Sequence, residues 1–153
     1  MSNVDLKSLV RENIKKLKAY HVENIDCAVK LHANENPFPP PLADFDSLDV
    51  LKLNRYPDPD CQALKQTIAQ RLQVTPENLV VGNGSDELIQ LIMQIFCDAG
   101  DKVAFPDPTF SMYAIIAQGL GLCPVSFPLD ERWDFEAGAF MQMVEKERPK
   151  VIF

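Results

Sequence analysis

From residue 79 onward, short apolar runs alternate with stretches in which apolar residues recur at helical spacing. The runs predict strands, and the stretches between them predict helices. Expected strands lie at 79–81, 102–105 (ended by Pro106), 122–127 and 151–153, and expected helices span 85–97, a segment starting at Thr109 or Ser111, and 135–147. This order predicts an α/β fold with a mostly parallel sheet flanked by helices.

The first half of the chain has a different pattern. Apolar positions at helical spacing predict a helix over 4–17, and a second helix, with Asp60 as its N-cap, carries Leu64, Ile68 and Leu72. A short strand is expected at Val29–His32. The proline-rich stretch 33–41 can form neither helix nor central strand, which indicates an extended arm.

We therefore expect two parts, an N-terminal arm with the proline-rich segment (1–50) and the first part of a larger domain (51–153). Val151-Ile152-Phe153 is apolar and β-prone, like a strand buried inside a sheet. A chain end is normally polar and peripheral. The sequence therefore predicts a domain truncated at its C-terminus.

Charge and composition exclude several classes of partner. The 153 residues carry a net charge of −7, which argues against binding to nucleic acid or anionic membranes. We see no apolar run of about 20 residues that could span a bilayer and no signal peptide. The cysteines Cys27, Cys61, Cys97 and Cys123 are widely spaced among apolar neighbours, as reduced thiols of a cytoplasmic protein are. Only His21 and His32 could join them as metal ligands, without suitable spacing, so no metal site is expected.

The most informative segment is the turn Val81-Gly82-Asn83-Gly84-Ser85 that leads into an amphipathic helix. A helix N-terminus offers unpaired N–H groups and a partial positive charge, so a phosphate could bind the amides of Ser85 and Asp86. Asp86 and Glu87 would repel it unless their carboxylates point away. An ordinary strand-to-helix connection with Gly84 or Ser85 as N-cap is the alternative. Neither the Walker pattern nor the dinucleotide fingerprint is present.

Four motifs follow one another in a fixed order, namely Ala33-Asn34-Glu35-Asn36-Pro37, Asn54-Arg55-Tyr56-Pro57, Gly84-Ser85-Asp86-Glu87 and Pro108-Thr109-Phe110. This ordered set resembles the N-terminal part of the histidinol-phosphate aminotransferase family, whose members are pyridoxal-phosphate enzymes of the aspartate-aminotransferase fold. The resemblance runs from about Leu9 to Phe153.

The resemblance implies roles for six residues. Ser85 and Asp86 would hold the phosphate of pyridoxal 5'-phosphate through their amides, and Phe110 would stack on its ring. Tyr56 would reach the cofactor phosphate of the other subunit of a homodimer. Tyr20 and Asn34 would lie on the substrate side. Without the resemblance, Phe110 would be interpreted as a core aromatic residue and Tyr56 as a turn residue.

The family's Schiff-base lysine, its aspartate for the pyridine nitrogen and its substrate-binding arginine find no counterpart in this sequence. The resemblance thus implies amino transfer between histidinol phosphate and 2-oxoglutarate by the full-length enzyme, and an inactive 153-residue chain. Alternatives are another pyridoxal-phosphate enzyme of the same fold, such as an aromatic-amino-acid aminotransferase or a decarboxylase, and a non-catalytic fragment that retains only dimerisation or phosphate binding.

Overall fold

The computed structural model describes residues 5–19, 29, 31, 33–38 and 53–153. The chain divides into two compact units, one made of 1–19 and 82–153 and the other of 20–81. Each unit is described by itself. The expected division at residue 50 stays a prediction.

Three parallel strands form the sheet of the first unit. They are β1 (Lys102–Asp107), β2 (Cys123–Pro128) and β3 (Val151–Ile152), in the order β2-β1-β3. Register runs from Lys102 opposite Cys123 to Asp107 opposite Pro128, so β1 continues through Pro106 and does not end there as expected. A parallel sheet connected by helices is the α/β class that the alternating pattern predicts, and the prediction is confirmed.

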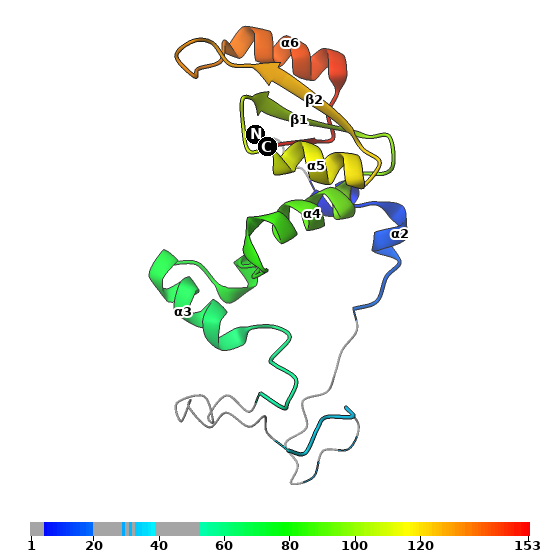
Figure 1. Ribbon diagram of the computed structural model, residues 1–153, viewed down its shortest axis with the longest axis vertical. Coiled ribbons are helices and arrows are strands. Elements are labelled where there is room, and N and C mark those ends of the chain that lie inside the picture. The colour runs from blue at the N-terminus through cyan, green and yellow to red at the C-terminus, as the bar shows by residue number, and fades with distance from the viewer. Residues whose placement is uncertain (1–4, 20–28, 30, 32, 39–52) are drawn as a thin grey trace. The chain divides into compact units, whose positions relative to one another are not determined.

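Helices cover both faces of this sheet (Figure 1): α6 (Ala137–Glu147) lies on one face, and α5 (Met112–Gly119) with α4 (Gly84–Phe96) on the other. Val103 and Phe105 of β1 point into the core under α4 and α5, where Met93 is fully buried. Ala104, between them, is also fully buried. Burial of alternate residues to both sides explains why this strand is apolar throughout.

A smaller aromatic cluster lies where α6 meets β2. Phe127, Phe135 and Phe140 pack edge to face, with ring centroids 4.9–5.9 Å apart. Glu136 caps α6 by accepting hydrogen bonds from the N–H groups of Gly138 and Ala139, and these bonds lower the pKa of its carboxyl. The helix therefore begins directly after Phe135, whose ring packs against Phe127 and Phe140.

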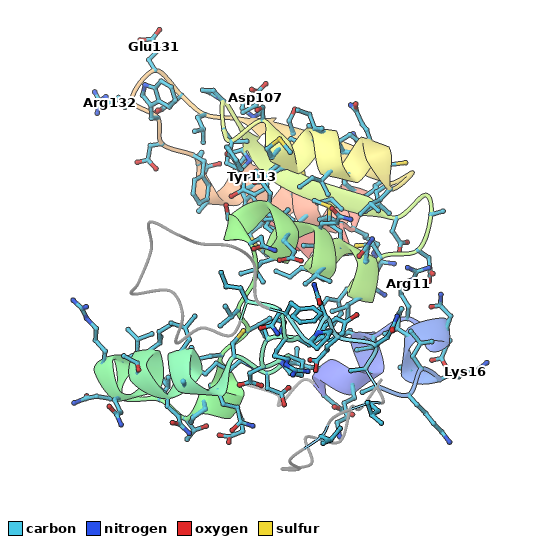
Figure 2. All side chains as sticks on the ribbon, turned by 60° about the horizontal axis from the view of Figure 1, so that its bottom comes forward. Arg11, Lys16, Asp107, Tyr113, Glu131 and Arg132 are labelled. Atoms are coloured by element: carbon cyan, nitrogen blue, oxygen red, sulfur yellow. The ribbon has the colours of Figure 1, made fainter. Side chains whose placement is uncertain are left out.

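The expected continuous helix over 4–17 is wrong. Two single turns form instead, α1 (Leu6–Leu9) and α2 (Glu12–Lys15), with Val10 and Arg11 extended between them. Arg11 donates its backbone N–H to Ile95 O (3.0 Å), its Nη1 to Gln94 O (2.9 Å) and its Nε to Asp98 (2.7 Å), at the end of α4 (Figure 2). The first two bonds satisfy carbonyls that the helix end leaves unpaired, and the third pairs the guanidinium with a carboxylate.

The second unit contains α3 (Gln62–Leu72) and the short 3₁₀ helix η2 (Pro76–Asn78). α3 begins near the expected place, but Asp60 is not its cap. The Asp58 carboxylate accepts from the N–H groups of Asp60 and Gln62 instead (3.0 and 2.7 Å). Asp58 precedes the turn and can fold back onto it, which the side chain of Asp60 does not do.

The expected strand at 79–81 is also wrong. Leu79 has extended dihedral angles (φ −115°, ψ 134°), as its β-prone neighbourhood predicts, but the described part of the chain contains no strand that pairs with this segment. Extended conformation follows from local preference, whereas a strand needs a neighbour with a free edge. Lys30 and His32 lie outside the described residues, so the strand expected at Val29–His32 stays a prediction.

Candidate functional site

The turn before α4 presents the backbone amides that the sequence singles out. Gly84 has φ +77°, a left-handed conformation that glycine adopts without strain, and its N–H donates to Gly82 O (3.0 Å). The residue at the N-cap is Asn83, not the expected Gly84 or Ser85, and its side chain makes no capping hydrogen bond. The amides of Ser85 and Asp86 in the first turn of α4 are therefore without a side-chain cap from Asn83.

Gly82 makes room for an acidic side chain. A Cβ atom there would lie 2.8 Å from Glu87 Oε2 and 3.0 Å from Leu88 Cδ2. The Glu87 carboxylate folds back over this glycine and accepts the N–H of Asn83. The Glu87 carboxylate thus pairs with the backbone N–H of Asn83 and does not occupy the N–H groups of Ser85 and Asp86. This is the orientation that the sequence requires if an anion is to bind beside Glu87.

A groove of about 480 Å³ runs beside this turn between α4 and α5. Its lining comprises Asn83, Asp86, Glu87, Gln90, Leu91, Gln94, Met112 and Ile116. Two carboxylates and no lysine or arginine contribute to this lining. An anion at the α4 N-terminus must therefore be bound by backbone amides, and cationic groups have to come from elsewhere.

Phe110 lies after β1, beyond the cis peptide bond between Asp107 and Pro108. Its ring meets Tyr113 edge to face at 5.7 Å, and Tyr113 stacks on Phe153 at 4.8 Å. Phe110 is 48% exposed, whereas a core aromatic residue would be buried. Phe110 thus contacts Tyr113 with one edge and remains about half exposed. Phe110 and Ser85 are not among the lining residues of the groove.

The other predicted site residues belong to the second unit. Tyr56 is 73% exposed, and Asn34 is exposed with φ +51°. Tyr20 lies outside the described residues. The segments that carry Asn34 and Tyr56 are joined by Glu35, whose carboxylate accepts from Arg55 Nη1 (2.9 Å) and from the N–H of Tyr56 (2.8 Å).

The sequence motifs include Glu35 but predict no role for it, and they do not predict the hydrogen bond from the Asn83 N–H to the Glu87 carboxylate. The role of Glu35 could have been inferred from the charges in the sequence. Glu35 and Arg55 are opposite charges in two motifs that the resemblance already grouped together.

Within the described ranges, no cluster of three or more His, Cys, Asp or Glu could hold a metal ion. No helix in the same ranges is long and apolar enough to cross a membrane. Cys61, Cys97 and Cys123 are free thiols, and burial raises the pKa of Cys97 in the core. Cys97 is thus a packing residue, as its apolar neighbours predict.

Comparison with known proteins supports the resemblance drawn from the motifs. Residues 27–153 match the family described as aminotransferase class I and II. The histidinol-phosphate aminotransferase of Caldanaerobacter subterraneus subsp. tengcongensis is 40% identical over 152 residues, which cover 97% of this chain and 43% of that protein. That of Aquifex aeolicus is 39% identical over 145 residues, covering 92% of this chain and 41% of that protein.

Solved structures agree with the fold. Histidinol-phosphate aminotransferase from Sinorhizobium meliloti, solved in complex with pyridoxal 5'-phosphate, aligns with a TM-score of 0.63 at 25% identity, over 78% of this chain and 33% of that one. An alanine aminotransferase from Pyrococcus furiosus aligns with a TM-score of 0.60 at 21% identity, over 76% of this chain and 32% of that one. The chain thus spans less than half the length of the relatives that it matches.

Proposed function

Since the chain belongs to the class I and II aminotransferase family, we propose that the protein is a histidinol-phosphate aminotransferase of histidine biosynthesis. It would transfer the amino group between histidinol phosphate and 2-oxoglutarate. The observation that carries this proposal is 40% identity along 97% of the chain to a protein of that name. Because the chain spans 43% of that relative, the activity is proposed for the whole protein.

Pyridoxal 5'-phosphate fits the residues present at the α4 N-terminus. Gly84 adopts a left-handed conformation, and the Glu87 carboxylate accepts the N–H of Asn83. The Asn83 side chain makes no capping bond, so it leaves the amides of Ser85 and Asp86 uncapped. Amides in the first turn of a helix bind phosphate through hydrogen bonds and the helix dipole. When bound, the cofactor supplies an aldehyde that carries the amino group and a ring that withdraws electrons.

The proposal assigns binding and orientation to residues of this chain. Ser85 and Asp86 bind the phosphate through their N–H groups, and Phe110 holds the ring by stacking. Tyr56 donates its hydroxyl to the phosphate bound by the other subunit of a homodimer. Asn34 and Tyr20 contact the substrate. None of these groups moves a proton on the reacting carbon, so they orient the reactants and leave the proton transfers to other residues.

The location proposed is the cytoplasm. Free thiols at Cys61, Cys97 and Cys123 support it, because a reducing compartment keeps cysteines unpaired.

The proposed reaction is tested with the purified complete protein, pyridoxal phosphate, histidinol phosphate and 2-oxoglutarate. We expect glutamate to form, measured by a coupled dehydrogenase assay, with a higher kcat/KM than for phenylalanine or tyrosine. Glutamate formation from aromatic amino acids only would reject histidinol phosphate and retain the aminotransferase class. Release of carbon dioxide without glutamate would favour a decarboxylase.

Replacing Phe110 by alanine is expected to weaken cofactor binding about tenfold. An aromatic contact of this kind contributes about 0.5–1.5 kcal/mol beyond burial, and 1.4 kcal/mol is a factor of ten. The dissociation constant is measured by titration of the complete protein with pyridoxal phosphate.

Phe135→Ala is the matched control, because Phe135 has the same 48% exposure and packs edge to face in the α6 cluster. Both variants lose an aromatic contact, but only Phe110→Ala should change cofactor affinity. Equal affinities for the two variants would assign Phe110 to packing alone.

A further inference from the structure

The carboxylate of Glu35 joins two segments that are about twenty residues apart in the sequence. It accepts one hydrogen bond from Arg55 Nη1 (2.9 Å) and another from the backbone N–H of Tyr56 (2.8 Å). A third bond runs beside these, from Asn54 Nδ2 to Asn36 O (2.9 Å). We call this group the Glu35 clamp: Glu35, Asn36, Asn54, Arg55 and the N–H of Tyr56.

The Glu35 clamp is unusual in its burial. The Glu35 side chain is only 2% exposed, whereas that of Arg55 is 39% exposed. A carboxylate withdrawn from water is stable only if charged or polar donors compensate for the lost hydration. Arg55 and the Tyr56 amide do this with charge-assisted bonds, which are shorter and stronger than neutral ones. Removing the charge of Glu35 therefore weakens the connection between the two segments.

The turn at Asn34 helps to direct Glu35. Asn34 has φ +51°, a left-handed conformation that asparagine tolerates better than most residues. The chain changes direction immediately before Glu35, and Asn34 remains exposed while the side chain of Glu35 is buried. Adjacent residues of one motif thus have opposite environments, one facing solvent and the other holding a second segment.

Tyr56 has the complementary property. Its backbone is fixed through the N–H bonded to Glu35, yet the residue is 73% exposed. An aromatic residue of this size, exposed on a restrained backbone, loses little conformational entropy when it binds a ligand. An exposed side chain on a restrained backbone is well suited to contact another molecule, and Tyr56 has both properties.

We propose that Glu35 is a positioning residue, which acts through the Tyr56 backbone to orient the Tyr56 hydroxyl for the cofactor phosphate of the partner subunit. This inference rests on the proposed function, because that function supplies the ligand. The inference adds a role for the Glu35–Arg55 pair. Affinity for the cofactor phosphate depends on the Glu35 carboxylate, which does not contact the phosphate.

The test is a double-mutant cycle in the complete dimeric protein, with the dissociation constant of pyridoxal phosphate as readout. Glu35→Gln retains the shape and an acceptor for the Tyr56 N–H but removes the charge that pairs with Arg55. We expect about fivefold weaker binding for Glu35→Gln and about tenfold for Tyr56→Phe. The double variant should bind within about twofold of Tyr56→Phe, because Glu35 acts only through Tyr56.

Glu77→Gln is the control, since it removes the same charge from an exposed glutamate of the same unit, and its affinity should equal that of the unmodified protein. The mass of each variant is measured in solution to show that the dimer persists. Arg55→Lys is the second route, because lysine retains the charge but not the planar geometry of the donor. It should weaken binding about threefold, with no further loss when Tyr56 is phenylalanine.

The outcomes separate the two proposals. If Tyr56→Phe weakens binding and the effect of Glu35→Gln multiplies with it, to about fiftyfold, Glu35 has a general structural role and this inference is wrong. It is equally wrong if neither Glu35→Gln nor Arg55→Lys changes the affinity. If Tyr56→Phe itself has no effect, the proposed contact of Tyr56 with the cofactor is rejected, and the inference with it.

Discussion

Replacing Gly84 by valine is expected to weaken the binding of pyridoxal phosphate about a hundredfold in the complete protein. Gly84 has φ +77°, where a β-branched residue is strained by about 1–3 kcal/mol. No atom lies within 4 Å of the position where its Cβ would be built, so the strain comes from the backbone alone. Relief of that strain rotates the turn and displaces the amides of Ser85 and Asp86. Loss of about 3 kcal/mol of charge-assisted hydrogen bonding corresponds to about two powers of ten in affinity.

The matched control for this variant is Gly100→Val. Gly100 has φ +87° and also has no atom within 4 Å of a Cβ, but it lies in the loop between α4 and β1. Both variants should lose similar stability in urea unfolding, and only Gly84→Val should lose cofactor affinity. Unchanged affinity in Gly84→Val would mean that the phosphate binds elsewhere. An equal loss in both variants would assign the effect to general destabilisation.

The second large effect concerns the 153-residue polypeptide on its own, which is expected to show no transamination. Covalent catalysis needs a lysine amine within bonding distance of the cofactor aldehyde. Lys102 begins β1, and a strand rises about 3.3 Å per residue, so it lies roughly 16 Å from Asp107, near which Phe110 follows. Lys102 is also paired with Glu147 at 2.8 Å. The lining of the groove beside α4 contains no lysine.

Borohydride reduction measures this directly. The polypeptide is mixed with pyridoxal phosphate, reduced, digested and analysed by mass spectrometry, with the Aquifex aeolicus relative as positive control. We expect the relative to carry one stoichiometrically modified lysine and the polypeptide to show only scattered, partial labelling. Stoichiometric labelling of one lysine in the polypeptide, together with turnover, would contradict the assignment of roles made here.

Hydrophobic periodicity and turn residues predicted most elements of the first unit, because neighbouring residues determine where these helices and strands begin and end. The glycines at 82 and 84 and the apolar period after them gave α4 within one residue, and the alternation that follows gave β1, α5, β2 and α6 in order. The wrong prediction of one helix over 4–17 has a nonlocal cause. Val10 and Arg11 leave the helix because Arg11 bonds the end of α4, a partner that no window of neighbouring residues includes. Leu79 is extended but pairs with no strand among the described residues.

The candidate site divides in a similar way. The turn proposed to bind phosphate was predictable in part. The positive φ at Gly84 follows from its residue type, whereas asparagine is a favoured N-cap residue, so the missing capping bond from Asn83 does not. The stacking of Tyr113, the edge-to-face neighbour of Phe110, on Phe153 was not predictable, because these two residues are forty positions apart in the sequence. The Glu35 clamp depends on contacts across about twenty residues, so its charges were visible in the sequence and its geometry was not.

The bonds between Arg11 and the end of α4 have a consequence for the order of folding. They join residues separated by more than eighty positions, whereas α4, β1, α5 and β2 contact near neighbours in the chain. Closing a long loop costs more entropy than closing a short one, so local contacts form first. During synthesis Arg11 emerges before Asp98, so the bonds of Arg11 cannot form until the end of α4 has been made. Arg11 and its neighbours are thus among the last residues of their unit to reach their native positions.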